Sequence, residues 1–213
     1  MKKISIIDYG CGNILNLARA IKFLGYEVET VRDKKKILDS SNIILPGVGA
    51  FGNAIKKLEK YDLQSCIIEY AKHNRPLLGI CLGMQLLLTE SYEFGTHRGL
   101  NLIEGKVVKI SNNDKKEIKI PHTGWNELYK AKEQDNLDNK FLKSNLLGKN
   151  FYYVHSYVCL TKNKSSTIAF SNYEEISIPA IITKNNIFGC QFHPEKSGDY
   201  GLKILQNFCE ISL

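Results

Sequence analysis

The sequence has no long apolar run. Its longest candidate, Pro76 to Leu88, is interrupted by Gly79, Gly83 and Gln85, whereas a membrane-spanning helix needs about 18 apolar residues in succession. Near the start, an acid, Asp8, follows Lys2 and Lys3 too closely to leave space for the apolar region of a signal peptide. We therefore expect a chain that does not bind or cross a membrane, is not exported and works in the cytoplasm.

The six cysteines form no C-x-x-C pair, and the sequence has no internal repeat or low-complexity segment. A C-x-x-C pair is the usual sign of a zinc site or a redox pair, and disulfide frameworks belong mainly to small secreted domains. With 213 residues, the chain is much longer than such domains. We expect no disulfide framework, no metal and no cofactor, so the remaining question is whether one thiol is reactive.

Patterns typical of nucleic-acid binding are also missing, although the net charge is +7. The lysines are scattered or form short clusters among acids, as at 34–36 and 115–116, without a recognition helix or an aromatic RNA-binding motif. This pattern indicates a solvated, slightly basic surface and no nucleic-acid partner. The alternative is a patch that meets an acidic partner or an anionic ligand.

The first half of the chain alternates apolar runs of strand length with helical stretches. Strands are predicted over 4–7, 27–31, 42–45 and 76–80, and helices over 14–24, 62–73 and 82–89. Such alternation is typical of a parallel sheet with helices on both faces. A length of 213 residues fits one compact domain. We therefore predict a doubly wound α/β fold in a single domain, residues 1–213.

The second half changes to short strands joined by turns. Strands are predicted over 106–110, 117–120, 151–154, 166–170, 179–183 and 187–191, with a hairpin turn at 184–186 and a final helix over 200–211. This half adds an antiparallel region to the parallel sheet.

The strongest chemical signal is Gly79-Ile80-Cys81-Leu82-Gly83, between a predicted strand and a predicted helix. It has the form of a nucleophile elbow, in which flanking glycines permit a strained turn that exposes the central side chain. The helix start favours the thiolate of Cys81, and the backbone N–H of Leu82 can hold an oxyanion. The alternative interpretation is a tight turn with a buried cysteine.

Among the five histidines, His193 alone has a partner built into its own segment. Pro194 favours an extended His193, so that the side chains of His193 and Glu195 project to the same side. This predicts Cys81 as nucleophile, His193 as base and Glu195 as the group that orients the base. Taken alone, the segment fits a surface turn equally well. The two signals reinforce each other because both follow strands of one sheet.

A second glycine-rich loop, Pro46-Gly47-Val48-Gly49, follows the third predicted strand. Its glycines allow the backbone to approach a ligand or to turn an N–H toward an oxyanion. The alternative is a tight turn without a chemical role.

Together these motifs resemble the class I (triad-type) glutamine amidotransferases, and among them the glutaminase subunits of imidazole glycerol phosphate synthase. The elbow and His193-Pro194-Glu195 are common to the whole class. Met84 and the segments 121–126 and 153–157 favour the subfamily. The matching segments are 8–13, 45–52, 79–85, 121–126, 153–157 and 191–197.

The resemblance implies a flavodoxin-like amidotransferase fold and a reaction. Cys81 would attack the carboxamide of L-glutamine, His193 would move protons, and Glu195 would orient His193. The oxyanion would be held by Leu82 and by the loop of Gly47, Val48 and Gly49. The groups expected to hold glutamine are Gln85, His155, Ser156 and Tyr157.

The resemblance also implies a partner. In this family ammonia passes to a (β/α)8-barrel cyclase subunit that makes imidazole glycerol phosphate and AICAR in histidine biosynthesis. Asn13, Trp125 and Lys196 fall where the family has its interface. We therefore expect a heterodimer, and poor hydrolysis of glutamine by this chain alone.

Three alternatives stay open at this point. Residues 171–179 are looser than the usual family pattern, which leaves room for a paralogue that supplies ammonia to another acceptor, such as a surface-sugar precursor. A non-catalytic module on the same fold would be expected to lack Cys81, His193 or Glu195, and all three are present. A cysteine peptidase would be expected to have a histidine at position 82, where Leu82 stands.

Overall fold

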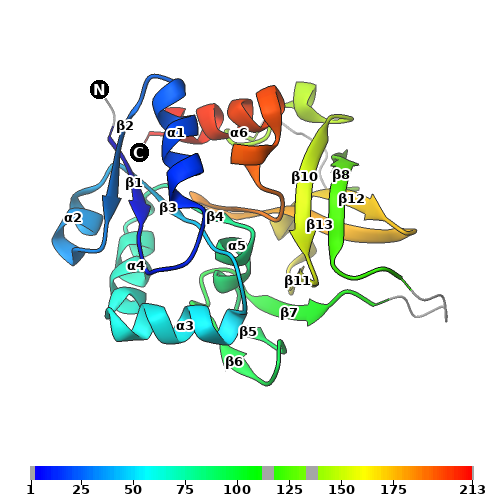
Figure 1. The fold of residues 1–213 in the computed structure, drawn as a ribbon, viewed down its shortest axis with the longest axis horizontal. Coiled ribbons are helices and arrows are strands. Elements are labelled where there is room, and N and C mark those ends of the chain that lie inside the picture. Colours follow the sequence, from blue (N-terminus) through cyan, green and yellow to red (C-terminus); the bar gives the residue numbers. More distant parts are fainter. Residues whose placement is uncertain (1–2, 112–117, 133–138, 213) are drawn as a thin grey trace.

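The computed structural model describes residues 3–111, 118–132 and 139–212. Its largest sheet has eight strands in the order β2-β1-β3-β4-β14-β13-β12-β9 (Figure 1). The first five of these strands run parallel, and β13, β12 and β9 continue the sheet in antiparallel fashion. These strands are β1 (Lys3–Ile7), β2 (Glu27–Val31), β3 (Asn42–Leu45), β4 (Leu77–Ile80), β9 (Tyr129–Lys130), β12 (Thr167–Tyr173), β13 (Ile176–Lys184) and β14 (Ile187–Cys190).

Helices cover both faces of the parallel part. In Figure 1, α1 and α6 lie above the sheet and α3 and α4 below it. The α-helices are α1 (Ile14–Phe23), α2 (Lys34–Asp39), α3 (Phe51–Lys60), α4 (Leu63–Lys72), α5 (Leu82–Leu86) and α6 (Gly198–Glu210), with short 3-10 turns η1 (Ser144–Leu146), η2 (Lys164–Ser166) and η3 (Pro194–Lys196). The predicted α/β architecture is confirmed.

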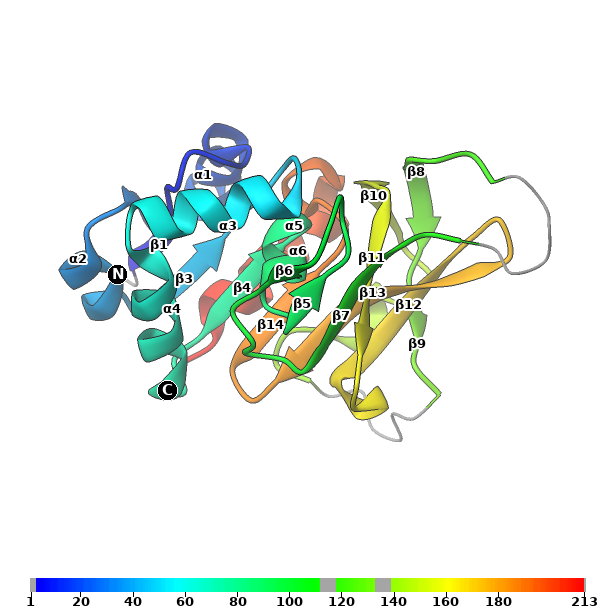
Figure 2. The same cartoon turned by 90° about the horizontal axis from the view of Figure 1, so that it is seen from below.

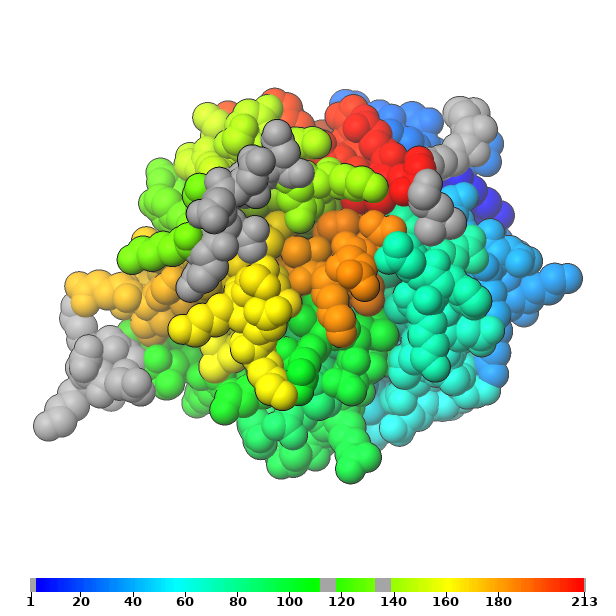
Figure 3. All heavy atoms as spheres, turned by 180° about the vertical axis from the view of Figure 1, so that it is seen from behind, coloured from blue at the N-terminus to red at the C-terminus, as the bar shows by residue number. Residues whose placement is uncertain are grey.

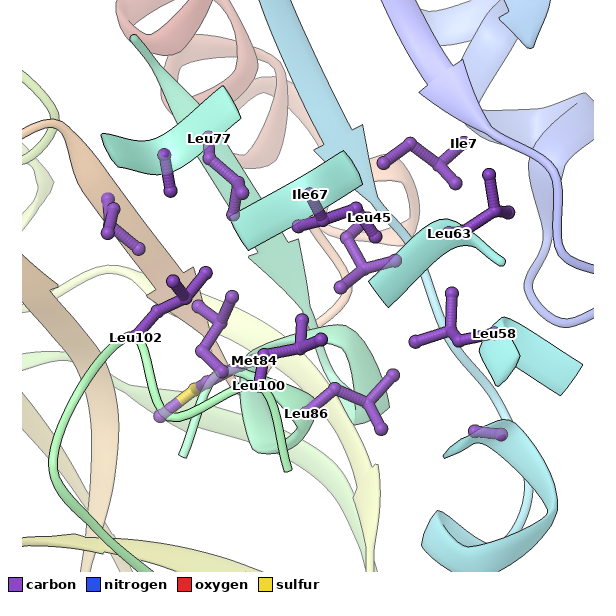
Figure 4. Packing of buried hydrophobic residues seen from close by; sticks show 14 of the residues in the cluster. Ile7, Leu45, Leu58, Leu63, Ile67, Leu77, Met84, Leu86, Leu100 and Leu102 are labelled. Carbon is purple, nitrogen blue, oxygen red and sulfur yellow. The ribbon is translucent and has the colours of Figure 1, made fainter. Parts of the chain in front are cut away.

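Alternation of side chains along each strand divides the apolar residues between two cores. On β3, Ile43 and Leu45 join the core beneath α3 and α4, whereas Ile44 joins the core on the α1 and α6 side. Successive strand residues point to opposite faces, so a sheet covered on both faces needs an unbroken apolar strand. Figure 4 shows the core beneath α3 and α4, where Leu45 and Ile67 lie between Leu63 and Leu77.

Two smaller sheets stand beside the large one. One pairs β10 (Asn150–His155) with β8 (His122–Glu127), and the other has the order β11-β7-β5-β6. The latter strands are β5 (Glu90–Ser91), β6 (His97–Arg98), β7 (Gly105–Lys109) and β11 (Tyr157–Thr161). In Figure 2, helices α2, α3 and α4 lie toward one end of the molecule, and β8, β9 and β12 lie toward the other.

The element predictions are correct in outline and wrong in several places. The hairpin at 184–186 is confirmed, since β13 and β14 pair on either side of it and Asn185 has a φ of 56°. Helices α2 and α3 and strands β5, β6, β8, β9 and β11 were not predicted. The helix expected over 82–89 ends at Leu86, and residues 118–120 are not a strand, while Glu117 lies outside the described residues.

Helix α1 stops one residue before the predicted end, through a glycine motif. Gly25 has a φ of 85°, and its N–H donates to Lys22 O at 2.9 Å. The N–H of Tyr26 donates to Ile21 O at 3.3 Å, which completes a Schellman arrangement. Within the described part of the chain, no helix is both long and apolar enough to cross a membrane.

The turn between β4 and α5 is held by backbones in very close contact. A Cβ built on Gly83 would lie 1.8 Å from the carbonyl oxygen of Leu45, and one on Gly79 would lie 2.6 Å from Gly83 O. Both neighbours are main-chain atoms, which cannot rotate away. Positions 79 and 83 therefore accept only glycine unless α5 shifts away from β4 or β3.

We expect Gly83→Ala to lower the free energy of unfolding by about 3 kcal/mol, because the methyl group overpacks the backbone of β3. Gly25→Ala is the matched control. Nothing lies within 4 Å of a Cβ at Gly25, so only its left-handed backbone opposes the substitution, at a cost of about 1 kcal/mol. Urea denaturation measures both, and equal losses in the two variants would contradict the close contact.

Candidate active site

Three neighbouring parallel strands end at the same edge of the large sheet. In the register of β3, β4 and β14, Leu45 pairs with Gly79 and Ile80 pairs with Cys190. The loop 46–49, Cys81 and the segment 191–195 follow directly from these strand ends. As predicted, the carboxyl edge of the sheet brings the three motifs together.

Cys81 sits on a strained turn. Its φ is 54° and its ψ is −111°, a conformation that non-glycine residues rarely adopt and that costs on the order of 1–3 kcal/mol. The N–H of Cys81 donates to Cys190 O at 2.8 Å, and its carbonyl accepts from Gln85 N at 3.2 Å. These bonds hold the turn from both sides, and Cys81 is 6% exposed.

His193 and Glu195 form a buried pair. Nδ1 of His193 lies 2.9 Å from Oε1 of Glu195, and both side chains are less than 5% exposed. The two side chains project to one side as predicted, but only His193 is extended, because Pro194 between them begins the 3-10 turn η3. Burial alone would lower the pKa of His193, but Cys81 and Glu195 together raise it to about 10. The site thus favours a charged imidazole beside the sulfur.

Two polar atoms of this pair have no hydrogen-bond partner. Nε2 of His193 and Oε2 of Glu195 are buried without a partner among the described residues. An unpaired buried polar atom costs about 1–3 kcal/mol. Since Nδ1 is occupied by Glu195, Nε2 is the imidazole atom left to exchange a proton with another group.

A pocket of about 280 Å³ opens at the thiol. It is lined by Val48, Gly49, Cys81, Leu82, Gln85, Glu93, Pro121, Val154, His155, Ser156, Tyr157 and His193. These walls include the nucleophile candidate, its base and all four residues expected to hold glutamine. Gly47 and Glu195 lie behind them, in a narrow crevice shared with Asn13.

The 47–49 loop presses against the start of α5. Gly47 is buried, and a Cβ on it would lie 2.8 Å from Gly83 N and 2.8 Å from Leu82 Cβ. Val48 is 45% exposed, and Gly49 has a φ of 100°. The glycine at 47 is therefore required for close approach, and the glycine at 49 for the turn itself.

One wall of the pocket consists of hydrogen-bonded amide and imidazole groups. Nε2 of Gln85 donates to Tyr157 O at 3.1 Å, and Nδ1 of His155 lies 2.9 Å from the same oxygen. Burial is the main cause that lowers the pKa of His155 to about 3 and also lowers that of His122, its neighbour at 3.0 Å. His155 is thus a neutral group that shapes the wall and not a base.

Comparison with known proteins identifies this arrangement. The pattern of the family described as glutamine amidotransferase class-I matches residues 5–211. The chain belongs to this family. It is 42% identical over 213 residues to imidazole glycerol phosphate synthase subunit HisH 1 of Legionella pneumophila strain Paris, covering 99% of this chain and 100% of the relative.

Other relatives carry the same subunit name. HisH of Lactococcus lactis is 45% identical over 210 residues and HisH of Caldanaerobacter subterraneus is 45% identical over 208, with at least 98% of each chain covered. Among solved structures, PurLQS of Thermotoga maritima matches with a TM-score of 0.73 at 20% identity, covering 97% of both chains. A structure titled glutamine amidotransferase matches with 0.71 at 18% identity, covering 96% and 98%. These structures show a shared fold.

Three residues that line this amidotransferase pocket, Glu93, Pro121 and Val154, were not predicted as site residues from the sequence, and Glu93 is the one with an ionisable side chain. Glu93 lies in the segment between β5 and β6, is 9% exposed and accepts from Phe51 N at 2.6 Å. Nothing in the local sequence marks it, because the segment is brought to the pocket only by the pairing of β5 with β7. Its carboxylate gives the pocket a negative wall.

Two of the three residues expected at the subunit interface of this family, Trp125 and Lys196, lie on the surface against the same tyrosine ring. Trp125 is 54% exposed, and its ring centroid lies 5.9 Å from that of Tyr152. The ammonium of Lys196, an exposed residue, lies 5.7 Å from the same Tyr152 ring. Asn13 lines the crevice behind His193 and Glu195.

A larger hollow of about 1000 Å³ lies at the opposite edge of the sheet, where β4 and β14 begin. Figure 3 shows this side, with the orange 184–187 turn beside the cyan end of α4. Its lining includes Lys72, Lys140 and Lys184 but none of the predicted site residues. It takes no part in the amidotransferase site.

We expect Glu195→Gln to lower the pKa of His193 by roughly 1–3 units, because a neutral amide no longer stabilises the imidazolium. Glu127→Gln, on an exposed carboxylate of β8, should leave that pKa unchanged. Two-dimensional ¹⁵N NMR of the imidazole rings against pH gives both midpoints. A His193 midpoint that is the same in both variants would show that Glu195 does not set its charge.

Proposed function

We propose that this chain is the glutaminase subunit of an imidazole glycerol phosphate synthase and hydrolyses L-glutamine to glutamate and ammonia. The observation that carries the proposal is the strained turn of Cys81 beside the buried His193–Glu195 pair, at a pocket of about 280 Å³. The assignment to imidazole glycerol phosphate synthase, and with it to histidine biosynthesis, is supported by the names of the relatives.

In the proposed reaction the Cys81 thiolate attacks the side-chain carboxamide carbon of glutamine. Collapse of the tetrahedral intermediate breaks the C–N bond, and His193 gives its Nε2 proton to the departing ammonia. His193 then takes a proton from water, which attacks the thioester. Collapse releases glutamate and restores the thiolate. Glu195 keeps Nε2 directed at these atoms by its bond to Nδ1.

The developing oxyanion needs N–H donors at the elbow. Leu82 supplies the first backbone N–H of α5, and the 47–49 loop lies against the same turn. We assign the second donor to this loop, within Gly47, Val48 and Gly49, because Val48 and Gly49 line the pocket beside Leu82.

The pocket walls suggest how glutamine is held. We assign Glu93 to the α-ammonium group, since it is an acidic side chain on the pocket wall whose carboxylate is already fixed by Phe51 N–H. Gln85 and the His155–Tyr157 wall would hold the remainder of the substrate. Ser156 lies between His155 and Tyr157 on this wall.

Ammonia would pass to a (β/α)8-barrel cyclase partner that makes imidazole glycerol phosphate and AICAR. The exposed Trp125 and Lys196, together with Asn13 next to the catalytic pair, support this face as the one that meets the partner. The six free cysteines fit a reducing compartment, so we place the heterodimer in the cytoplasm.

We expect Cys81→Ala, assayed in the complex with its cyclase partner, to lose glutamine-dependent turnover by at least about 10³-fold, because Cys81 carries the one thiol among the residues that line the pocket. Turnover with free ammonium should persist, since the acceptor site lies in the partner. Cys66→Ala, on a buried thiol of α4, is the control. Retained glutamine-dependent turnover would reject Cys81 as the nucleophile.

We expect Glu93→Gln to raise KM for glutamine by about 10- to 100-fold with kcat little changed, because a charged hydrogen bond to the bound substrate is lost. Glu104→Gln, on an exposed carboxylate paired with Lys162, should leave both constants unaltered. Steady-state glutaminase kinetics in the complex separates the two constants. An unchanged KM in Glu93→Gln would remove Glu93 from the substrate site.

A further inference from the structure

Gln191 stands directly after β14 and is completely buried. Its backbone N–H donates to Ala180 O at 2.9 Å, which fixes the main chain against β13. Its side-chain Nε2 donates to Cys81 Sγ at 3.7 Å, and its Oε1 accepts from Gln85 Nε2 at 3.2 Å. One side chain thus contacts both the nucleophile and a wall of the pocket.

The contact with Gln85 determines how that amide is turned. Nε2 of Gln85 has two hydrogens, and they are directed at Tyr157 O and Gln191 Oε1. With both hydrogens engaged inside the protein, only the oxygen of Gln85 is left for a substrate. Gln85 therefore presents an acceptor to the pocket, in an orientation that Tyr157 O and Gln191 hold together.

We propose that Gln191 is a positioning residue for the glutaminase reaction, which donates an N–H to the Cys81 sulfur and holds Gln85 with its oxygen toward the substrate. The inference rests on the proposed function of Cys81. A hydrogen bond to a charged acceptor in a water-poor site is stronger than one between neutral groups. An amide also has no titration of its own, so this donor is present at every pH at which the protein is folded.

Other groups near Cys81 also influence its charge and remain in place when Gln191 is replaced. His193 faces the sulfur, with Glu195 behind it, and Glu93 and His155 line the pocket. The hydroxyl of Tyr9 and the thiols of Cys159 and Cys190 are close enough to interact with Cys81 electrostatically. A change confined to residue 191 therefore isolates the contribution of its amide.

Gln191→Met tests the proposal, since methionine matches the length of glutamine but has no amide. The probe is iodoacetamide, and the rate of Cys81 alkylation is followed against pH by mass spectrometry of its peptide. We expect the midpoint of the rate profile to move upward by about one pH unit, which corresponds to an acid dissociation constant of the thiol that is about tenfold smaller. Gln206→Met, on the exposed face of α6, should keep the original midpoint.

A second variant separates the two roles. Gln85→Met should raise KM for glutamine in the complex by about tenfold and leave the alkylation midpoint of Cys81 unchanged, whereas Gln191→Met should alter both. Gln191→Asn keeps a polar amide at the position but is one methylene too short to bridge the two contacts. It should behave as Gln191→Met does. Circular dichroism verifies that each variant is folded.

The outcomes are distinguishable. An alkylation midpoint in Gln191→Met and Gln191→Asn equal to that of Gln206→Met would overturn the contact with sulfur. A normal KM in Gln191→Met would overturn the role toward Gln85. If Cys81 of the unsubstituted chain reacts no faster at neutral pH than buried Cys66, the proposed nucleophile is wrong, and that result is visible without any variant.

Discussion

The register of β3 against β4 and of β4 against β14 is the constraint on which the rest of the structure depends. It places Leu45 beside Gly79 and Ile80 beside Cys190. The three adjacent strands therefore end at the same edge of the sheet, and the loops that follow them start side by side. The absence of a side chain at Gly83 then lets α5 start against the backbone of β3. A slip of one residue between these strands would reverse the faces of the buried side chains.

The site is a polar cluster inside an apolar body. Cys81 occupies a strained backbone conformation, and His193 and Glu195 each keep one unpaired buried atom. Each feature opposes folding by about 1–3 kcal/mol. The two cores on either face of the sheet offset this, since strands such as β3 and β4 are apolar on both sides.

The sequence predicts those parts of the fold that depend on local pattern. Unbroken apolar runs revealed β3 and β4, and Pro194 was enough to place His193 beside Glu195. Helix α3 was missed although Phe51, Ala54, Ile55 and Leu58 have helical spacing, whereas the six residues of α2 bury only Ile37 and are too short to show a period. Glu93 and the bonds of Gln191 depend on pairing between distant strands, which no local pattern encodes.

The position of β14 has a consequence for how the molecule is assembled. β14 lies in the middle of the sheet, between β4 and β13. In the sequence, however, β14 (Ile187–Cys190) is separated from β4 (Leu77–Ile80) by nine other strands in the described part of the chain. Until it inserts, β4 has an open edge and Cys81 N–H lacks its acceptor on Cys190. Cys81 therefore gains this backbone acceptor only after β14 has been synthesised, so a growing chain that ends before β14 lacks a bond that holds the elbow.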